Sequence, residues 1–141
     1  MKNIYEVFDE FEAAENKKDR MAVIERNLNK TLVQVLELTY HPNYEWLVSE
    51  MPDNYKIPTD ILPGISPQSL STQLRKLYLF RKGDPTAEKL TPQKRKELLL
   101  QLLESIEPRE AEVIIGIFNK DLGVKGLNYK FVKEAFPQLL P

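Results

Sequence analysis

Hydrophobic positions recur at helical spacing along most of this chain. In the first segment they lie three or four residues apart, after a candidate cap at Asn3: Ile4, Val7, Phe8, Phe11 and Ala14. This spacing predicts an amphipathic helix with those side chains on its inner face. The outward positions of the same helix are acidic: Glu6, Asp9, Glu10 and Glu12.

Two further helices are predicted before Pro42. A break at Asn16 precedes the first, with Asp19 as its cap or in its first turn, and its inward residues are Met21, Val23, Ile24 and Leu28. The second covers residues 30–40, where apolar residues are dense enough for a buried helix. A short helix is then expected over residues 44–48, with Trp46 as a core anchor rather than a platform for base stacking.

Residues 51–67 hold four prolines and predict a connection, because proline cannot continue a helix interior. Ser66 and Pro67 then form a cap-and-proline start for a helix over residues 66–80. Its expected inward residues are Leu70, Leu74, Leu77 and Tyr78. A basic turn over residues 81–85 ends it.

Three more helices complete the pattern. Thr91-Pro92 opens one whose inward residues are Leu98, Leu99, Leu102, Leu103 and Ile106. Glu107-Pro108 opens the next, which ends at Asp121 or Leu122 and turns Val113, Ile114, Ile117 and Phe118 inward. A basic helix runs from Asn128 to Pro137. The fold class is therefore all-α: a single compact bundle of about seven or eight short helices over residues 1–141, with the proline-rich connection inside it.

Composition narrows the function classes. Charged residues make up 29% and hydrophobic residues 42%, as in soluble globular proteins. The absence of cysteine excludes disulfides, thiolate metal sites and cysteine nucleophiles. The single histidine, His41, lies beside Pro42, and we expect a surface or capping role for it. No apolar run reaches the roughly 18–20 residues of a membrane span, and the N-terminus lacks the order of a signal peptide.

Charge is unevenly distributed along the chain. Residues 1–60 carry 12 acids and 7 bases, a net −5, whereas residues 61–141 carry 9 acids and 13 bases, a net +4. Residues 75–96 hold eight bases and only two acids, Asp84 and Glu88, so their net charge is +6. This segment is compatible with a footprint on a polyanion, and equally with a solvated helix face.

The loop before the last helix offers a candidate anion site. Gly123 and Gly126, on either side of Val124 and Lys125, can adopt positive φ and bring bare N–H groups close to a partner. The helix beginning at Asn128 would add unpaired N–H groups and its positive dipole end. Four lysines surround this point: Lys120, Lys125, Lys130 and Lys133. Such a combination suits a phosphate oxygen, although a glycine-terminated helix with solvated lysines would look the same.

Catalysis has little support in this sequence. The carboxylates fall on expected outer helix faces, and none is flanked by the apolar residues that would raise its pKa for acid–base chemistry. The glycine loop follows a helix and lacks the GK[ST] of a phosphate-binding loop. No metal-ligand spacing is present either. We therefore expect no enzyme activity and no cofactor.

Three blocks of the chain resemble a known family. They are residues 22–40, which end in Leu38-Thr39-Tyr40; residues 66–82, which end in Arg81-Lys82; and residues 118–141, with Lys120-Asp121-Leu122 and Ala135-Phe136-Pro137. Together they are similar to the N-terminal all-helical DNA-binding domain of ATP-dependent DNA ligases, especially of T4-like phage ligases. The architecture also resembles a family of small uncharacterised proteins of tailed phages, cyanophages in particular.

The resemblance implies contact with the backbone of duplex DNA. It assigns the phosphates to the segment from Gly123 to Asn128 with the four lysines, and a second stretch to Arg81 and Lys82. The chain departs from the ligases at Lys120, where they tend to have arginine, so a bidentate phosphate contact becomes a point charge. It also lacks the Lys-x-Asp-Gly adenylation motif, so this chain alone is not a ligase. It would be a free-standing relative or a fragment.

Two functions remain open at this point. One is a non-catalytic module that binds duplex DNA without sequence specificity. The other is an adaptor that keeps the fold but not DNA binding, with phage replication or virion proteins as partners. The acidic first helix and the pI near 5.9 favour the adaptor. Either protein would be located in the host cytoplasm or the virion, without a membrane partner.

Overall fold

The computed structural model of the chain describes residues 3–48 and 70–141. These residues form eight α-helices and one 3-10 helix: α1 (Ile4–Ala13), α2 (Lys17–Arg26), α3 (Lys30–Tyr40), α4 (Leu70–Leu74), η1 (Leu77–Phe80), α5 (Pro85–Lys89), α6 (Pro92–Glu104), α7 (Pro108–Asn119) and α8 (Tyr129–Ala135). Over the same residues no strand occurs, only one antiparallel bridge between Trp46 and Arg81. The all-α prediction is confirmed. The proline-rich connection and the start at Ser66-Pro67 lie outside the described residues.

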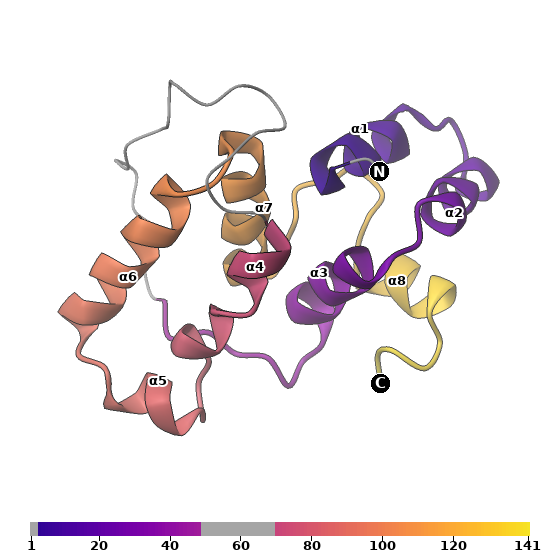
Figure 1. Cartoon of the computed structure of the whole chain (residues 1–141). Coiled ribbons are helices and arrows are strands. Elements are labelled where there is room, and N and C mark those ends of the chain that lie inside the picture. Colours follow the sequence, from indigo (N-terminus) through magenta and orange to yellow (C-terminus); the bar gives the residue numbers. More distant parts are fainter. Residues whose placement is uncertain (1–2, 49–69) are drawn as a thin grey trace.

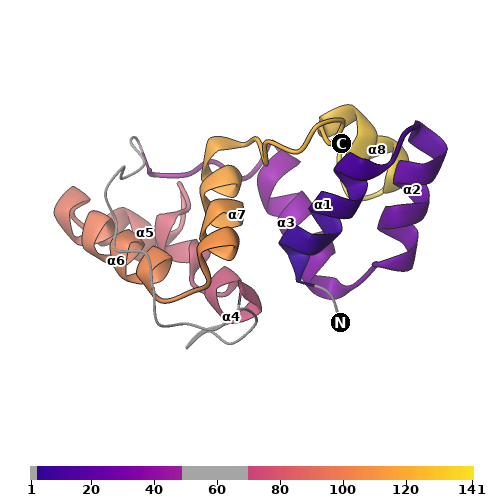
Figure 2. The same ribbon diagram turned by 90° about the horizontal axis from the view of Figure 1, so that it is seen from above.

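The helices form two groups joined by α7. Helices α1, α2, α3 and α8 lie together at one end, which we call the terminal group, and α4, α5 and α6 lie at the other, which we call the middle group (Figures 1 and 2). Helix α7 contacts α1 and α3 on one side and α6 on the other. One hydrophobic cluster runs through both groups, from Phe11 and Leu36 to Ile114 and Leu103.

Local caps set the starts of α1 and α2, as the sequence predicts. Asn3 and Glu6 form a reciprocal capping box at α1. The side chain of Asn16 accepts a hydrogen bond from the N–H of Asp19 at 2.8 Å, so Asp19 lies in the first turn of α2 and Asn16 is its cap. His41 caps the C-terminus of α3, which confirms its expected capping role.

The later helices also begin where their caps predict. The side chains of Thr91, Glu107 and Asn128 accept hydrogen bonds from first-turn N–H groups of α6, α7 and α8. The end of α7 is earlier than predicted, at Asn119. Lys120 has φ 59° there, and the N–H of Asp121 donates to the carbonyl of Gly116 at 3.0 Å. This left-handed residue terminates the helix before Asp121.

The helix predicted over residues 44–48 is wrong. Its backbone is extended and pairs with the segment after η1, since Leu47 N–H donates to the Phe80 carbonyl at 2.6 Å and Lys82 N–H donates to the Glu45 carbonyl at 2.8 Å. A partner 35 residues away thus satisfies groups that a helix would satisfy locally. Trp46 does pack against the core, with its ring centroid 5.2 Å from that of Phe118.

The single helix predicted over residues 66–80 is also wrong in its described part. It is divided into α4 and η1. In a 3-10 helix residues three apart share a face, so Leu77 and Phe80 are both buried while Tyr78 is 49% exposed, contrary to the prediction for Tyr78. The short helix α5, capped by Asp84, was not predicted within the basic turn and the residues after it.

Candidate nucleic-acid interface

The backbone of the C-terminal loop is largely paired within the protein. Gly123 N–H donates to the Asp121 carboxylate at 2.9 Å, and Lys125 N–H donates to the Glu12 carboxylate of α1 at 3.1 Å. Leu127 N–H donates to the Val124 carbonyl at 3.0 Å, and Val124 itself is buried. The expectation that these amides are free for a phosphate is therefore wrong for Gly123, Lys125 and Leu127, because α1 and the loop itself supply their acceptors.

Gly126 has a structural reason to be glycine. Its φ is +86°, and a Cβ added there would lie 2.6 Å from Nη1 of Arg20. The guanidinium of Arg20, on α2, thus takes the close approach that the sequence suggested for a phosphate. Gly123 also has positive φ, +69°, but has open space around its Cα. The glycines serve the turn and the docking of α2.

The start of α8 is satisfied in part. The side chain of Asn128 accepts from Phe131 N–H at 2.9 Å, and its carbonyl accepts from Val132 N–H at 3.0 Å. The helix has only seven residues. The Asn128 cap binds two N–H groups of α8, so the helix end offers fewer donors to an anion than the sequence predicts.

The four lysines of the predicted site are not equivalent. The Lys120 ammonium donates to the carbonyls of His41 at 2.8 Å and Tyr44 at 3.0 Å, and burial lowers its pKa. The Lys133 ammonium donates to the Leu140 carbonyl at 2.7 Å. Only Lys125 and Lys130 of this set are exposed. The idea of four lysines around one open loop is therefore wrong for Lys120 and Lys133, which fasten the chain internally.

Arg81 and Lys82 lie beside residues 44–45, where Lys120 at the start of this loop also binds. Arg81 places its guanidinium carbon 4.3 Å from the centre of the Tyr44 ring, and the Lys82 ammonium is 3.3 Å from the Glu45 carboxylate. Both belong to the turn before α5, whereas α8 lies at the opposite end of the molecule in both views (Figures 1 and 2). The structure thus brings the second stretch near Lys120, whose ammonium is already bound to carbonyls, but not near α8.

The middle group carries a second set of cations, which we call the basic surface. Its members are exposed in the turn after α4, the turn before α5, the end of α5 and the first turns of α6: Arg75, Lys76, Lys82, Lys89, Lys94 and Lys96. Among the described residues, the salt bridges include only Lys82 from this set. Sequence reasoning found the charge of this segment but placed only Arg81 and Lys82 in the site.

The two acids of the segment are occupied by backbone groups. The Asp84 carboxylate accepts from Thr86 N–H at 2.8 Å and Ala87 N–H at 3.1 Å, which caps α5. The Glu88 carboxylate accepts from Gly83 N–H at 2.9 Å. Their hydrogen-bonding capacity thus goes to local structure, and the segment keeps its net positive charge toward solvent.

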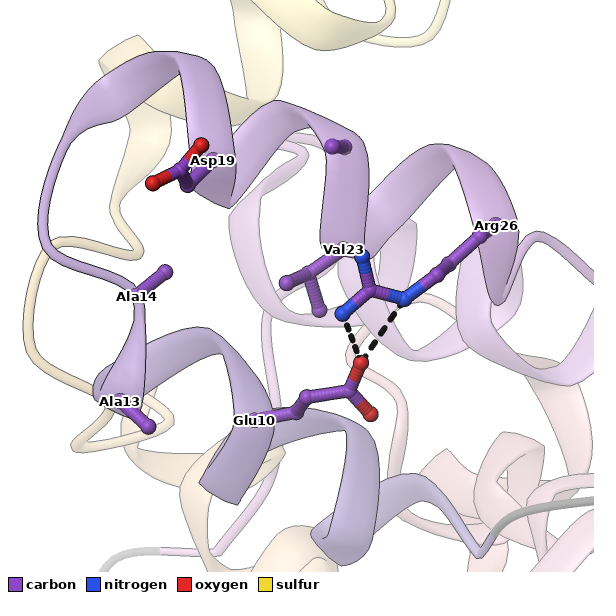
Figure 3. A pocket seen from close by; sticks show the side chains of 7 residues that line it. Glu10, Ala13, Ala14, Asp19, Val23 and Arg26 are labelled. Atoms are coloured by element: carbon purple, nitrogen blue, oxygen red, sulfur yellow. Dashed lines mark hydrogen bonds and ion pairs between the residues drawn. The ribbon is translucent and has the colours of Figure 1, made fainter.

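A hollow between α1 and α2 has a different character. Its volume is about 300 Å³, and it is lined by Ala13, Ala14 and Val23 with charged side chains around them. Arg26 Nε donates to a Glu10 carboxylate oxygen at 2.8 Å across it (Figure 3). Because its acid and base pair with each other, this hollow offers no cation excess to a polyanion.

Two further kinds of site are not found where the structure describes the chain. Residues 3–48 and 70–141 contain no group of three or more histidine, aspartate or glutamate side chains placed to hold a metal ion. None of the helices described is long and apolar enough to cross a membrane.

The fold and its surfaces define an all-α protein with a basic middle group and a closed C-terminal loop. Residues 7–124 match a family of unknown function, DUF6433, and the chain belongs to this family. No curated protein matches the sequence.

Proposed function

We propose that this protein is a non-catalytic module that binds the phosphate backbone of duplex DNA without reading its sequence. The observation that carries the proposal is the basic surface of the middle group. The resemblance of three sequence blocks to the DNA-binding domain of phage-type DNA ligases supports it. Cation–phosphate contacts of this kind position a protein on DNA but do not specify a sequence.

The first turns of α6 strengthen this choice of surface. Lys94, Arg95 and Lys96 follow one another there, and the first turn contains no acid. Cations near a helix N-terminus oppose the helix dipole by about 0.3–1 kcal/mol each. A phosphate group brought to this surface would relieve that repulsion, whereas water only screens it.

The test is charge reversal of Lys94 and Lys96 to glutamate, followed by gel shifts with intact, nicked and single-stranded DNA at two salt concentrations. We expect duplex affinity to fall and the slope of log affinity against log salt to decrease by about 2, roughly 1 for each lost phosphate contact. Glutamate is favoured near a helix N-terminus, so the variant should melt no earlier than the parent.

Charge reversal of Lys125 and Lys130 is the matched comparison, because it changes the same net charge at the opposite end of the molecule. The sequence alone predicts that this pair abolishes binding, whereas the closed loop leads us to expect a smaller loss. If reversal at Lys94 and Lys96 leaves both affinity and salt slope unchanged, the basic surface is not the DNA site. If neither variant differs from a parent that binds, the proposal fails at both places.

The adaptor remains the second candidate. Its sequence support included the acidic face of α1, but all four of those carboxylates have partners within the protein: Glu6 with Asn3, Asp9 with Arg109, Glu10 with Arg26, and Glu12 with the Lys125 N–H. Among the described residues, the exposed large hydrophobic side chains are separated along the chain: Leu28 between α2 and α3, Tyr78 on η1 and Tyr129 on α8. Failure of the parent to shift any DNA at low salt would favour the adaptor, with a phage replication or virion protein as partner.

A further inference from the structure

A pocket of about 220 Å³ opens between α4, η1 and α6. Its walls are apolar and aromatic, with Phe80 from η1 and Leu98 and Leu102 from α6, and Gln73 from α4 forms part of its lining. Lys76 and Gln101 also line it and are exposed. Pockets for drug-sized ligands usually exceed about 300 Å³, so this one suits a single small ring system.

The Gln73 side chain is the unusual member of this lining. The residue is 1% exposed, and neither its amide oxygen nor its amide nitrogen has a hydrogen-bond partner among residues 3–48 and 70–141. Leaving a buried polar group unpaired is costly, and an apolar side chain of the same length would avoid that cost. An amide retained at this position is explained if a ligand in the pocket pairs with it.

The chemistry of a carboxamide identifies the ligand class. One acceptor and one donor lie side by side, so the amide can form two parallel hydrogen bonds with a partner that presents the complementary pair. The unpaired Watson–Crick edge of every DNA base contains such a neighbouring donor and acceptor. Phe80, Leu98 and Leu102 give the pocket an apolar lining for a planar ring.

Charge around the pocket is suited to a strand that carries the base. Lys76 lines the pocket itself, and Lys94 precedes Leu98 by one helical turn on α6, so it lies on the same face of that helix. Both belong to the basic surface, where backbone phosphates are proposed to bind. A small molecule that carries an amide but no phosphate would not pair with these cations.

The geometry points to a subsite for one unpaired nucleobase, held by the Gln73 amide between Phe80 and α6. This inference rests on the proposed DNA-backbone function for its location and adds a preference for DNA with unpaired bases. Within an intact duplex the base would first have to leave its stack, which opposes binding. Single strands, gaps and frayed ends are therefore the expected ligands.

The first experiment uses nucleosides, because they lack phosphate and so test the pocket without the basic surface. Thymidine and adenosine are added to the full chain, and the NMR signals of the Leu98 and Leu102 methyl groups and the Phe80 ring are followed. We expect saturable shifts in the parent protein and none in Gln73→Met. Ribose and N-methylacetamide are the controls for the sugar and for a generic amide.

Gln73→Met keeps the side-chain length and removes the unpaired amide, so it should melt no earlier than the parent. The second experiment compares a single-stranded thymidine oligonucleotide with an abasic strand of equal phosphate number. The parent should bind the strand with bases roughly tenfold more tightly, and Gln73→Met should bind both strands equally.

Shifts that persist in Gln73→Met, or that N-methylacetamide or ribose reproduces, would overturn the base subsite. So would equal binding of both strands together with no nucleoside shift, although backbone binding would then stand. Nucleoside shifts without binding of any strand would instead retain the pocket and reject the proposed DNA function.

Discussion

At the scale of single residues, the buried Glu110 carboxylate is electrostatically unfavourable to the folded state. Its side chain is buried on α7, one carboxylate oxygen has no partner, and burial raises the pKa of the group above its usual 4.5. The backbone N–H of Leu70 donates to the carboxylate, which lowers the pKa but does not offset the effect of burial. The folded state therefore holds the Glu110 proton more tightly than the unfolded state does.

We predict that Glu110→Gln stabilises the protein at neutral pH by about 1 kcal/mol, the scale of an unsatisfied buried polar group. Because the folded pKa is raised, the wild-type contribution is fully present below pH 4.5 and is lost as pH rises through the folded value. The variant, which mimics the protonated form, should match the wild type below pH 4 and exceed it at pH 7 in urea unfolding.

Exposed Glu112, on the same helix, supplies the control for this experiment. Glu112→Gln removes the same charge from α7 and should change stability by less than about 0.5 kcal/mol at either pH. A Glu110→Gln variant that is less stable than the wild type at pH 7 would mean that its ionised carboxylate stabilises the fold.

At the residue scale, the sequence predicts correctly those features that neighbouring residues determine. Asn3, Thr91 and Asn128 cap their helices through N–H groups two or three residues further along, and these spacings are visible in the sequence. It was wrong for Lys120, because the carbonyls that accept from its ammonium are 76 and 79 residues away. A lysine that binds two segments of the chain together can have the same neighbours in sequence as a lysine that binds a phosphate.

At the scale of elements, the ion pair between α1 and α7 is the most specific contact. The guanidinium nitrogens of Arg109 donate to both Asp9 oxygens at 2.6 and 2.7 Å, and the same guanidinium lies 4.8 Å from the centre of the Tyr5 ring. The Arg109 hydrogen bonds hold the pKa of Asp9 below its usual 3.8. Both side chains are about half exposed, so solvent screens much of this attraction.

We predict that Asp9→Asn destabilises the protein by a few tenths to 1 kcal/mol at pH 7, the range of exposed pairs. Because the folded pKa is lowered, the wild-type contribution is present above pH 3.8 and is lost as pH falls through the folded value. Urea unfolding at pH 7 and pH 2 should therefore show the difference between variant and wild type narrowing in acid.

Glu15→Gln is the companion variant, since Glu15 is exposed just beyond α1. It should not change the pH dependence of stability. A destabilisation by Asp9→Asn that is as large at pH 2 as at pH 7 would show that shape or packing, rather than charge, is lost.

The division of residues 70–80 into α4 and η1 shows why element boundaries escaped the sequence. Leu70, Leu74 and Leu77 satisfy a continuous helical pattern, and all three are buried as predicted. The tightening at η1 follows from Phe80, whose carbonyl pairs with Leu47 and whose ring packs 5.4 Å from that of Phe118. Neither partner is near in sequence, so periodicity alone could not place the break.

At the scale of the whole molecule, distant segments close the C-terminal loop. Glu12 on α1 accepts from the Lys125 N–H, Arg20 on α2 lies against Gly126, and Lys17 forms an ion pair with Glu134 on α8. The sequence predicted the loop, its positive-φ glycines and the helix after it. It could not show that side chains of the terminal group would contact this loop and helix, because all three contacting residues are more than 100 residues away in the sequence.

Because contacts link the two groups of helices, we predict that the protein unfolds as one unit. A single unfolding transition would support the single-domain prediction. Helix α7 contacts both groups, and one hydrophobic cluster spans them.

Trp46, the sole tryptophan, reports on their junction, because it stacks on Tyr44 and meets Phe118 of α7 edge to face. Its fluorescence and the far-UV circular dichroism of all helices should therefore give coincident urea transitions, with one slope of roughly 1–3 kcal/mol/M. Loss of the Trp46 signal at lower urea, with a plateau in helicity, would mean that the middle and terminal groups fold independently and that α7 does not couple them.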